Sequence, residues 1–504
     1  KKWSFTSGVA YSFSGFALGT SHMIGFTIAY CWLPWVLLFT WLWLKDQSIR
    51  NTILLALTVY LHLTGAYIAL SIVLFYILLI IIIGKLIKSR DLLYSKRILR
   101  SGSILGLVVL ILSSPFLYSI YDSIGYISRF NPLEYDTGLY KGNFSWQCFQ
   151  SLVFPYINSS VTGFQNVDVS LSNIYVGVLI LIFSVIGFRL LKSKHKLLVA
   201  GTITISFLLA LGIYTPIHRF TVSYIPGFDF FRHPYLFTLY PTLIMVLLSG
   251  YGLSKLNWDK LLIRNALIGV LAVILTIITY SVFNANFSEW SSYMYLTKLL
   301  ADRSPLNNEA HVVIQGLFLL VILIIAVVLV SNKARFRIAL PYLIVFEMFI
   351  AVQLNGPKNM YYNEPFSDVL QELDKFPYSL TNQDAQTPIH SYNNDSLRAS
   401  VGLWHNLNSL ERVVGSEGYN PFVFESFQQL KEGYKLDTII SKGLVQVRLN
   451  DTVSNLQLSF NKIEFEVKAP LQSTLLVLQN YHHNWSINDP HTLVRDSTGL
   501  ISIN

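Results

Sequence analysis

Long apolar runs separated by short polar segments fill the first 355 residues of the chain, and the last third lacks such runs. A run of about 18 or more apolar residues crosses about 30 Å of hydrocarbon as one helix. Windows 24–44, 66–84 and 312–331 reach this length without a charged residue. Membrane spans are predicted at 24–44, 51–63, 66–84, 98–118, 174–191, 197–214, 235–253, 265–284, 312–331 and 338–354. Residues 1–20 resemble a further span already under way, so we expect a transmembrane domain of about 10 to 11 helical segments over residues 1–355.

The span at 51–63 is too short to cross a bilayer normally. We expect segment 51–84 to go out and return, with a turn near "HLTGAY" at 62–67. A broken helix of this kind is tolerated where its loose backbone is buried in protein or lines a watery cavity.

Polar residues dominate after residue 355, and residues 356–504 are predicted to form a separate soluble domain. Apolar and polar residues alternate there in short stretches separated by turn residues, which is typical of antiparallel strands. The four stretches are "GLVQVRL", "NLQLSF", "KIEFEVKA" and "STLLVLQNY". The fold class predicted for the whole chain is a mainly α polytopic membrane protein with a C-terminal β-rich domain, expected to be a β-sandwich.

Composition supports the membrane assignment, because 53% of the 504 residues are hydrophobic and 13% are charged, against about 25% charged in soluble domains. Eighteen basic residues lie in the loops 45–50, 85–100, 189–196, 255–264 and 333–337. Only 6 lie in the alternate loops 121–173, 215–234 and 285–311. The positive-inside rule makes the first set cytoplasmic and places the second set, the long outer loops 119–173 and 285–311 and the C-terminal domain outside. This asymmetry explains the net charge of +9 without a nucleic-acid partner.

The outer segment "PGFDFFRHPYLFTLYP", at 226–241, concentrates charge just before an uncharged helix. Arg232 and His233 precede the proline that begins this helix, where free N–H groups favour an anion. The functional interpretation is a site for a lipid phosphate, assisted by His218 and Arg219. The alternative is that Arg232 and His233 anchor the chain at the membrane interface and pair with Asp229.

Loop 119–173 supplies acidic candidates for a general base that would activate an acceptor hydroxyl, namely Asp122, Glu134 and Asp136. Arg129 in the same loop is a further candidate for binding phosphate. For each carboxylate the competing interpretation is a solvated loop charge.

Three ionisable residues fall in or near predicted spans: Glu347, His62 and His22. Glu347 is a functional candidate because an unpaired carboxylate in hydrocarbon is expensive, and the alternative is a neutral, hydrogen-bonded packing residue. His62 and His22 are candidates for lining a cavity, with a structural role as the competing interpretation. No His, Asp or Glu spacing predicts a metal site, so the cofactor requirement stays open.

Four short motifs occur in an order that resembles the YfhO family of bacterial multi-pass membrane proteins. They are "AYSFSGF" at 10–16, "GFDFFRHP" before "LLSGYGL" at 247–253, "GSEGYNPF" at 415–422 and "TLLVLQNYHHNWSI" at 474–487. The chain departs from the family in two places. The last motif has His482, His483 and Asn484 between its tyrosine and tryptophan, where the family usually has Tyr-Tyr and then Gly-Trp. Leu236 stands where many members have a second arginine.

The resemblance implies a glycosyltransferase of the GT-C type in the bacterial cytoplasmic (inner) membrane. Such enzymes move a sugar from a polyprenyl-phosphate carrier to a cell-envelope acceptor, such as teichoic acid, polysaccharide or a lipid-linked glycan, on the outer face. The carrier phosphate would lie at Arg232 and His233, with Arg219 or Arg129 neutralising charge on the departing phosphate. The resemblance also implies a critical acidic residue in a first outer loop that would precede Lys1, and further strands with a last transmembrane helix at the C-terminal end. The chain is therefore expected to lack both ends of a full member.

Two other functions fit the same composition. A flippase or other transporter of lipid-linked sugars would use the polar residues along a pathway, although no twofold repeat is visible. A non-catalytic assembly partner of an envelope machine would use the C-terminal domain as its interaction surface.

Overall fold

The computed structural model describes residues 2–21, 23–88, 95–127, 142–155, 169–255, 260–285, 308–359, 424–426, 429, 445–447, 452–459, 462–468, 474–488 and 490–504. The chain forms two compact units. The first consists of Lys1–Phe116 and Leu133–Tyr361, and the second of Leu117–Pro132 and Tyr362–Asn504. Residues Leu117–Pro132 thus belong with the C-terminal part of the chain.

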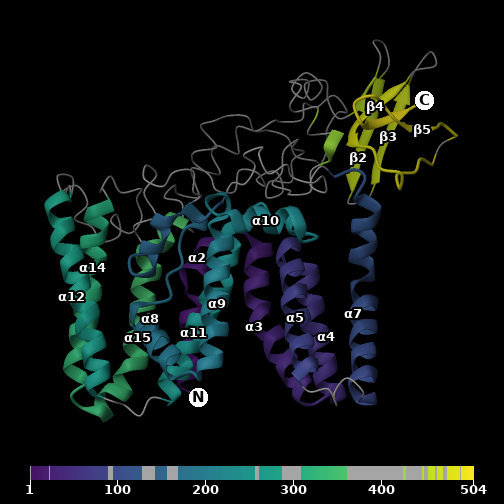
Figure 1. Cartoon of the computed structure of the whole chain (residues 1–504). Coiled ribbons are helices and arrows are strands. Elements are labelled where there is room, and N and C mark those ends of the chain that lie inside the picture. Colours follow the sequence, from purple (N-terminus) through teal and green to yellow (C-terminus); the bar gives the residue numbers. More distant parts are fainter. Residues whose placement is uncertain are drawn as a thin grey trace. The chain divides into compact units, whose positions relative to one another are not determined.

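Helices build the first unit (Figure 1). The α-helices are α1 (Lys2–Ser12), α2 (Gly15–Thr20), α3 (Ile24–Lys45), α4 (Ile49–Gly65), α5 (Ile68–Lys88), α7 (Lys96–Ser123, which continues into the second unit), α8 (Val178–Leu190), α9 (Ser193–Ala210), α10 (Pro216–Tyr224), α11 (Leu239–Lys255), α12 (Lys260–Asn284), α14 (Asn308–Leu329) and α15 (Lys333–Asn359). The short 3-10 helices are η2 (Trp146–Leu152), η4 (Val169–Leu171), η5 (Gly212–Tyr214), η6 (Phe228–Phe230) and η7 (Pro234–Thr238).

Seven helical segments among the described residues are long and apolar enough to cross a membrane. They are Ile24–Lys45, Ile68–Lys88, Lys96–Ser123, Pro234–Lys255, Lys260–Asn284, Val312–Leu329 and Lys333–Gln353. The prediction of a multi-pass, mainly helical membrane protein is therefore confirmed. The predicted spans at 51–63, 174–191 and 197–214 also form helices, α4, α8 and α9, which fall outside these seven because they are shorter or less apolar.

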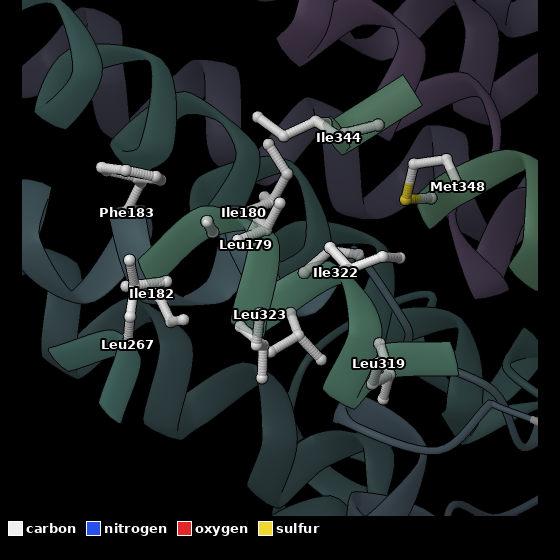
Figure 2. Packing of buried hydrophobic residues seen from close by; sticks show 14 of the residues in the cluster. Leu179, Ile180, Ile182, Phe183, Leu267, Leu319, Ile322, Leu323, Ile344 and Met348 are labelled. Carbon is white, nitrogen blue, oxygen red and sulfur yellow. The ribbon is translucent and has the colours of Figure 1, made fainter. Parts of the chain in front are cut away.

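Buried aliphatic and aromatic side chains of α8, α12, α14 and α15 pack together in the core of the first unit (Figure 2). Leu179 and Phe183 on α8 are fully buried, as are Leu267 on α12 and Ile344 on α15. Most side chains of α8 are apolar and buried, which is the pattern of a helix that packs mainly against protein. With 13 residues, α8 is shorter than a normal membrane span, and it packs against neighbouring helices.

Two glycines allow α8 and α11 to approach closely. A Cβ atom at Gly187 would lie 2.0 Å from the backbone oxygen of Leu248, and one at Gly252 would lie 2.6 Å from that of Phe183. Both distances are far below van der Waals contact, so neither position has room for a side chain. Small residues of this kind let helix backbones pack tightly in membranes.

The described part of the second unit contains two antiparallel sheets (Figure 1). One has the order β1-β4-β6-β5 and the other pairs β2 with β3. The strands are β1 (Val445–Gln446), β2 (Thr452–Ser459), β3 (Lys462–Lys468), β4 (Leu475–Asn480), β5 (Leu493–Arg495) and β6 (Leu500–Ile503). Alternate residues of β3, including Phe465, pack on the apolar face that Val477 and Ile501 form in the larger sheet. The predicted antiparallel, β-rich region is confirmed, and β5 and β6 are strands that the sequence patterns did not single out.

Candidate functional site

Tyrosine hydroxyl groups fix the segment that carries the predicted phosphate-binding residues. Tyr67, which precedes α5, donates a 3.0 Å hydrogen bond to the backbone oxygen of Phe230. Tyr76 on α5 donates a bond of the same length to the backbone oxygen of Pro226. The segment's aromatic residues point inward, and the ring centroids of Phe231 and Phe237 stack 4.6 Å apart. The polar residues of 226–233 are thus presented on a loop that is held at both its ends.

His233 lies among aromatic rings at the ends of α3 and α5. Its ring centroid is 5.7 Å from that of Phe26 and 6.3 Å from that of Tyr67. Gly142 lies against the same imidazole, since a Cβ atom there would be 2.8 Å from the Nδ1 atom. Gly142 also has φ +96°, a conformation that favours glycine. The imidazole therefore has a defined position between three segments that are far apart in sequence.

Arg232 is partly exposed and lies directly before the membrane span Pro234–Lys255. His233 is the N-cap residue of η7, and its backbone oxygen accepts a 3.0 Å hydrogen bond from the N–H of Leu236. The N-terminal end of the span, which is the positive end of its helix dipole, thus lies beside Arg232. A cation at this position adds to the field that attracts an anion.

The other predicted phosphate-binding residues differ in exposure. His218 and Arg219 are neighbours on α10, which contacts α9 and η6 and runs across the ends of the upright helices in Figure 1. Arg219 is exposed, whereas His218 is 1% exposed and burial lowers its pKa to about 4. His218 is consequently uncharged at neutral pH. Asp229, in η6, is partly exposed.

Glu347 is a buried hydrogen-bond acceptor between two helices. It lies on α15, is 1% exposed, and accepts a 2.7 Å hydrogen bond from the hydroxyl of Tyr175. Its carboxylate also accepts from the backbone N–H groups of Val178 and Leu179, at the start of α8. The N-cap residue of α8 is Gly177, which provides no side chain. Glu347 therefore caps α8 from a neighbouring helix, which fits the packing interpretation of this residue.

His62 lies near the break between α4 and α5. The residue is buried, and its Nδ1 atom is 3.2 Å from the hydroxyl of Ser71. The break falls at Ala66 and Tyr67, where the N–H of Tyr67 donates a 3.0 Å hydrogen bond to the oxygen of Gly25. The turn predicted at 62–67 is present, and its backbone is bonded inside the protein.

Asp122 belongs to the second unit and is held by residues that follow β4. Its Oδ1 atom is 2.8 Å from His483 Nε2, and its Oδ2 atom accepts a 2.6 Å hydrogen bond from the side chain of Asn484. His482 Nε2 lies 3.4 Å from Oδ2. Both carboxylate oxygens of Asp122 are therefore engaged.

The remaining predicted site residues, Arg129, Glu134, Asp136 and His22, lie outside the described residues. Tyr67 and Gly142, which contact His233, were not among the site residues predicted from the sequence. For Tyr67, the sequence shows only a tyrosine just after the predicted helix break. For Gly142, it shows only an isolated glycine in a loop, which is not a specific signal. The pair His482–His483 was visible as a departure from the family motif, but its partner Asp122 lies 360 residues away from His482.

No protein-family model, curated protein or solved structure matches the chain. What can be stated of the chain therefore rests on the helices and strands described above. It is a multi-pass membrane protein that has seven candidate spans among the residues the structure describes, together with a small C-terminal antiparallel sheet region.

Proposed function

We propose that the protein is a GT-C-type glycosyltransferase that resembles the YfhO family. It takes a sugar from a polyprenyl-phosphate carrier and transfers it to a cell-envelope glycan acceptor on the outer face of the cytoplasmic membrane. The observation that carries the proposal is Arg232 beside His233 at the start of the span Pro234–Lys255. A lipid phosphate needs a cation at the depth where a membrane helix begins, and this position provides one.

Rigid support of the loop favours this role over a simple interface anchor. An anchor needs only an amphipathic side chain at the headgroup level. Here two tyrosine hydroxyls hold the loop backbone, and Phe26, Tyr67 and Gly142 surround the imidazole of His233. Binding sites need side chains that are held in place by their neighbours, because each ångström of misplacement lowers the rate.

The guanidinium of Arg232 would bind the carrier phosphate in a bidentate manner and stabilise its charge as the glycosidic bond breaks. His233 would donate a hydrogen bond to the same phosphate. His218 is neutral and buried, so its role would be to support α10. Arg219, which is exposed, or Arg129 would neutralise charge on the departing phosphate.

A carboxylate must take the proton from the acceptor hydroxyl. Asp122 is poorly suited to this task, because His483 and Asn484 already occupy its oxygens. The candidates for the base are therefore Glu134, Asp136 and the acidic residue of a first outer loop that the resemblance implies. The attacking acceptor oxygen forms the new bond to the anomeric carbon, and polyprenyl phosphate leaves with the bonding electrons.

Purified protein in liposomes, supplied with a polyprenyl-phosphate sugar and an acceptor glycan, tests the proposal. Wild type should release the bare carrier and glycosylate the acceptor. Arg232→Ala should release carrier at least about 100-fold more slowly, which corresponds to the loss of one charge contact in the transition state. Arg264→Ala, which removes an exposed arginine of α12, is the matched control and should keep full activity.

The same preparation separates the alternatives. A flippase would move the intact lipid-linked sugar across the bilayer without releasing carrier, and an assembly partner would do neither. Either result in wild type would contradict the enzymatic proposal.

A further inference from the structure

We propose that Asp122, His482 and His483 bind a divalent transition-metal ion of the zinc class. The three residues lie within the second unit, where the C-terminal end of α7 meets the segment that follows β4. The inference does not depend on the proposed transferase activity.

The ligand atoms are close enough to share one ion. One nitrogen from each histidine and one oxygen of Asp122 all lie within 4.8 Å of one another. Zinc bonds of about 2.0–2.1 Å in a tetrahedron place neighbouring ligand atoms about 3.4 Å apart. The distance from His482 Nε2 to Asp122 Oδ2 is 3.4 Å, and that from His483 Nε2 to Oδ1 is 2.8 Å. A small outward movement of His483, whose side chain is 51% exposed, would admit the ion.

The chemistry of the donors selects the metal. Two imidazoles and one carboxylate are a common zinc set with a fourth position open to water. Calcium and magnesium prefer sites built from oxygen ligands only. Divalent ions such as zinc, cobalt and nickel therefore fit this group better than calcium or magnesium.

Residues around the ligands hold them in position. The hydroxyl of Tyr126 is 3.2 Å from His483 Nδ1, and its ring centroid is 4.6 Å from that of His482. Tyr126 is itself fixed, since its backbone oxygen accepts a 2.8 Å hydrogen bond from the N–H of Glu425. A tyrosine hydroxyl can accept as well as donate, so it can accept a hydrogen bond from Nδ1–H when Nε2 binds metal.

His482 must change its tautomer when it binds the ion. Its Nδ1 atom accepts a 3.2 Å hydrogen bond from the N–H of Asn484, which places the proton of the neutral ring on Nε2. Binding through Nε2 moves this proton to Nδ1. The imidazole then loses the hydrogen bond from the N–H of Asn484 and gains a bond to the metal. His482 should therefore contribute less to affinity than His483.

The ion would link two parts of the chain that are 360 residues apart in sequence. A cross-link that closes a long loop restricts the unfolded chain, and a ligand that binds only the folded state stabilises it. The expected consequence is a metal-stabilised second unit.

Titration of the full chain in detergent with zinc chloride, after chelator treatment and removal of any polyhistidine tag, tests the site. Wild type should bind one ion per chain at this site, and zinc should raise its melting temperature. His483→Gln and Asp122→Asn should each weaken binding by about tenfold or more, whereas His491→Gln, an exposed histidine elsewhere in the unit, should not.

Cobalt provides a spectroscopic readout of the ligand set itself, which the wild-type protein alone can supply. Wild type loaded with Co²⁺ should show the visible absorption of a four-coordinate site, and His483→Gln should lose it. Absence of stoichiometric zinc binding in wild type would overturn the proposal. Equal binding by wild type, His483→Gln and Asp122→Asn would overturn it as well.

Discussion

The carboxylate of Glu347 on α15 accepts a 2.7 Å hydrogen bond from the hydroxyl of Tyr175, just before α8. The same carboxylate accepts the first free N–H groups of α8, at Val178 and Leu179. A residue that looked like a candidate for chemistry in the membrane is therefore tied to the start of a buried helix.

Glu347→Ala should lower the free energy of unfolding by about 3 kcal/mol, because it leaves buried donors without an acceptor. Glu347→Gln keeps an acceptor oxygen and should lose about 1 kcal/mol. Melting temperatures of the purified variants measure the difference. Glu464→Ala, at a half-exposed position on β3, is the control and should change little. Equal melting temperatures for Glu347→Ala and wild type would refute the capping role.

Gly187→Ala should destabilise the protein strongly, since its Cβ atom would lie 2.0 Å from the backbone oxygen of Leu248. Backbone cannot move aside without separating α8 from α11, and we expect a loss of about 1–3 kcal/mol. Gly201→Ala on α9 is a matched helical control, because no atom lies within 4 Å of its added Cβ. The control should match or exceed the wild-type melting temperature, since alanine favours helix. A Gly187→Ala variant as stable as Gly201→Ala would show that the two helices do not pack this closely.

Stability should fall as the pH is lowered from about 6.5 to about 4 because of His218. Burial lowers its pKa from 6.5 to about 4, so the unfolded chain binds this proton in a range where the folded chain does not. The contribution is about 2 kcal/mol between pH 7 and pH 5. His218→Phe should remove this part of the acid sensitivity, and melting curves at the two pH values measure it. The exposed His195→Phe variant serves as the control. If His218→Phe and His195→Phe lost stability in parallel with wild type, His218 would not be the cause.

Much of the helical architecture could be predicted from the sequence because the bilayer sets a fixed length for an apolar run. The predicted span 24–44 corresponds to α3 (Ile24–Lys45), and 265–284 lies within α12 (Lys260–Asn284). The length of an apolar run was less informative for a helix that packs mainly against protein, such as α8, because packing there replaces contact with lipid. The short strands β5 and β6 were missed since their pattern is too brief to stand out. They pair across a turn in which Asp496 accepts the N–H groups of Thr498 and Leu500.

The candidate site could be predicted only in part. The charge of Arg232 before a proline is a local pattern, and the sequence shows it. The neighbours that hold His233, including Phe26 and Gly142, come from distant segments, and no local spacing reveals them. The same limit applies to Asp122 and His483, since a metal site built across hundreds of residues has no spacing motif.

The initial rate of carrier release from a polyprenyl-phosphate sugar, measured for wild type, Arg232→Lys and Arg232→Ala in liposomes, tests the central claim most directly. We expect an intermediate rate for Arg232→Lys, which keeps the charge but loses the bidentate fork. We expect a rate at least about 100-fold below wild type for Arg232→Ala, with unchanged expression and melting temperature. Carrier release by Arg232→Ala at the wild-type rate would contradict the assignment of this arginine to the carrier phosphate.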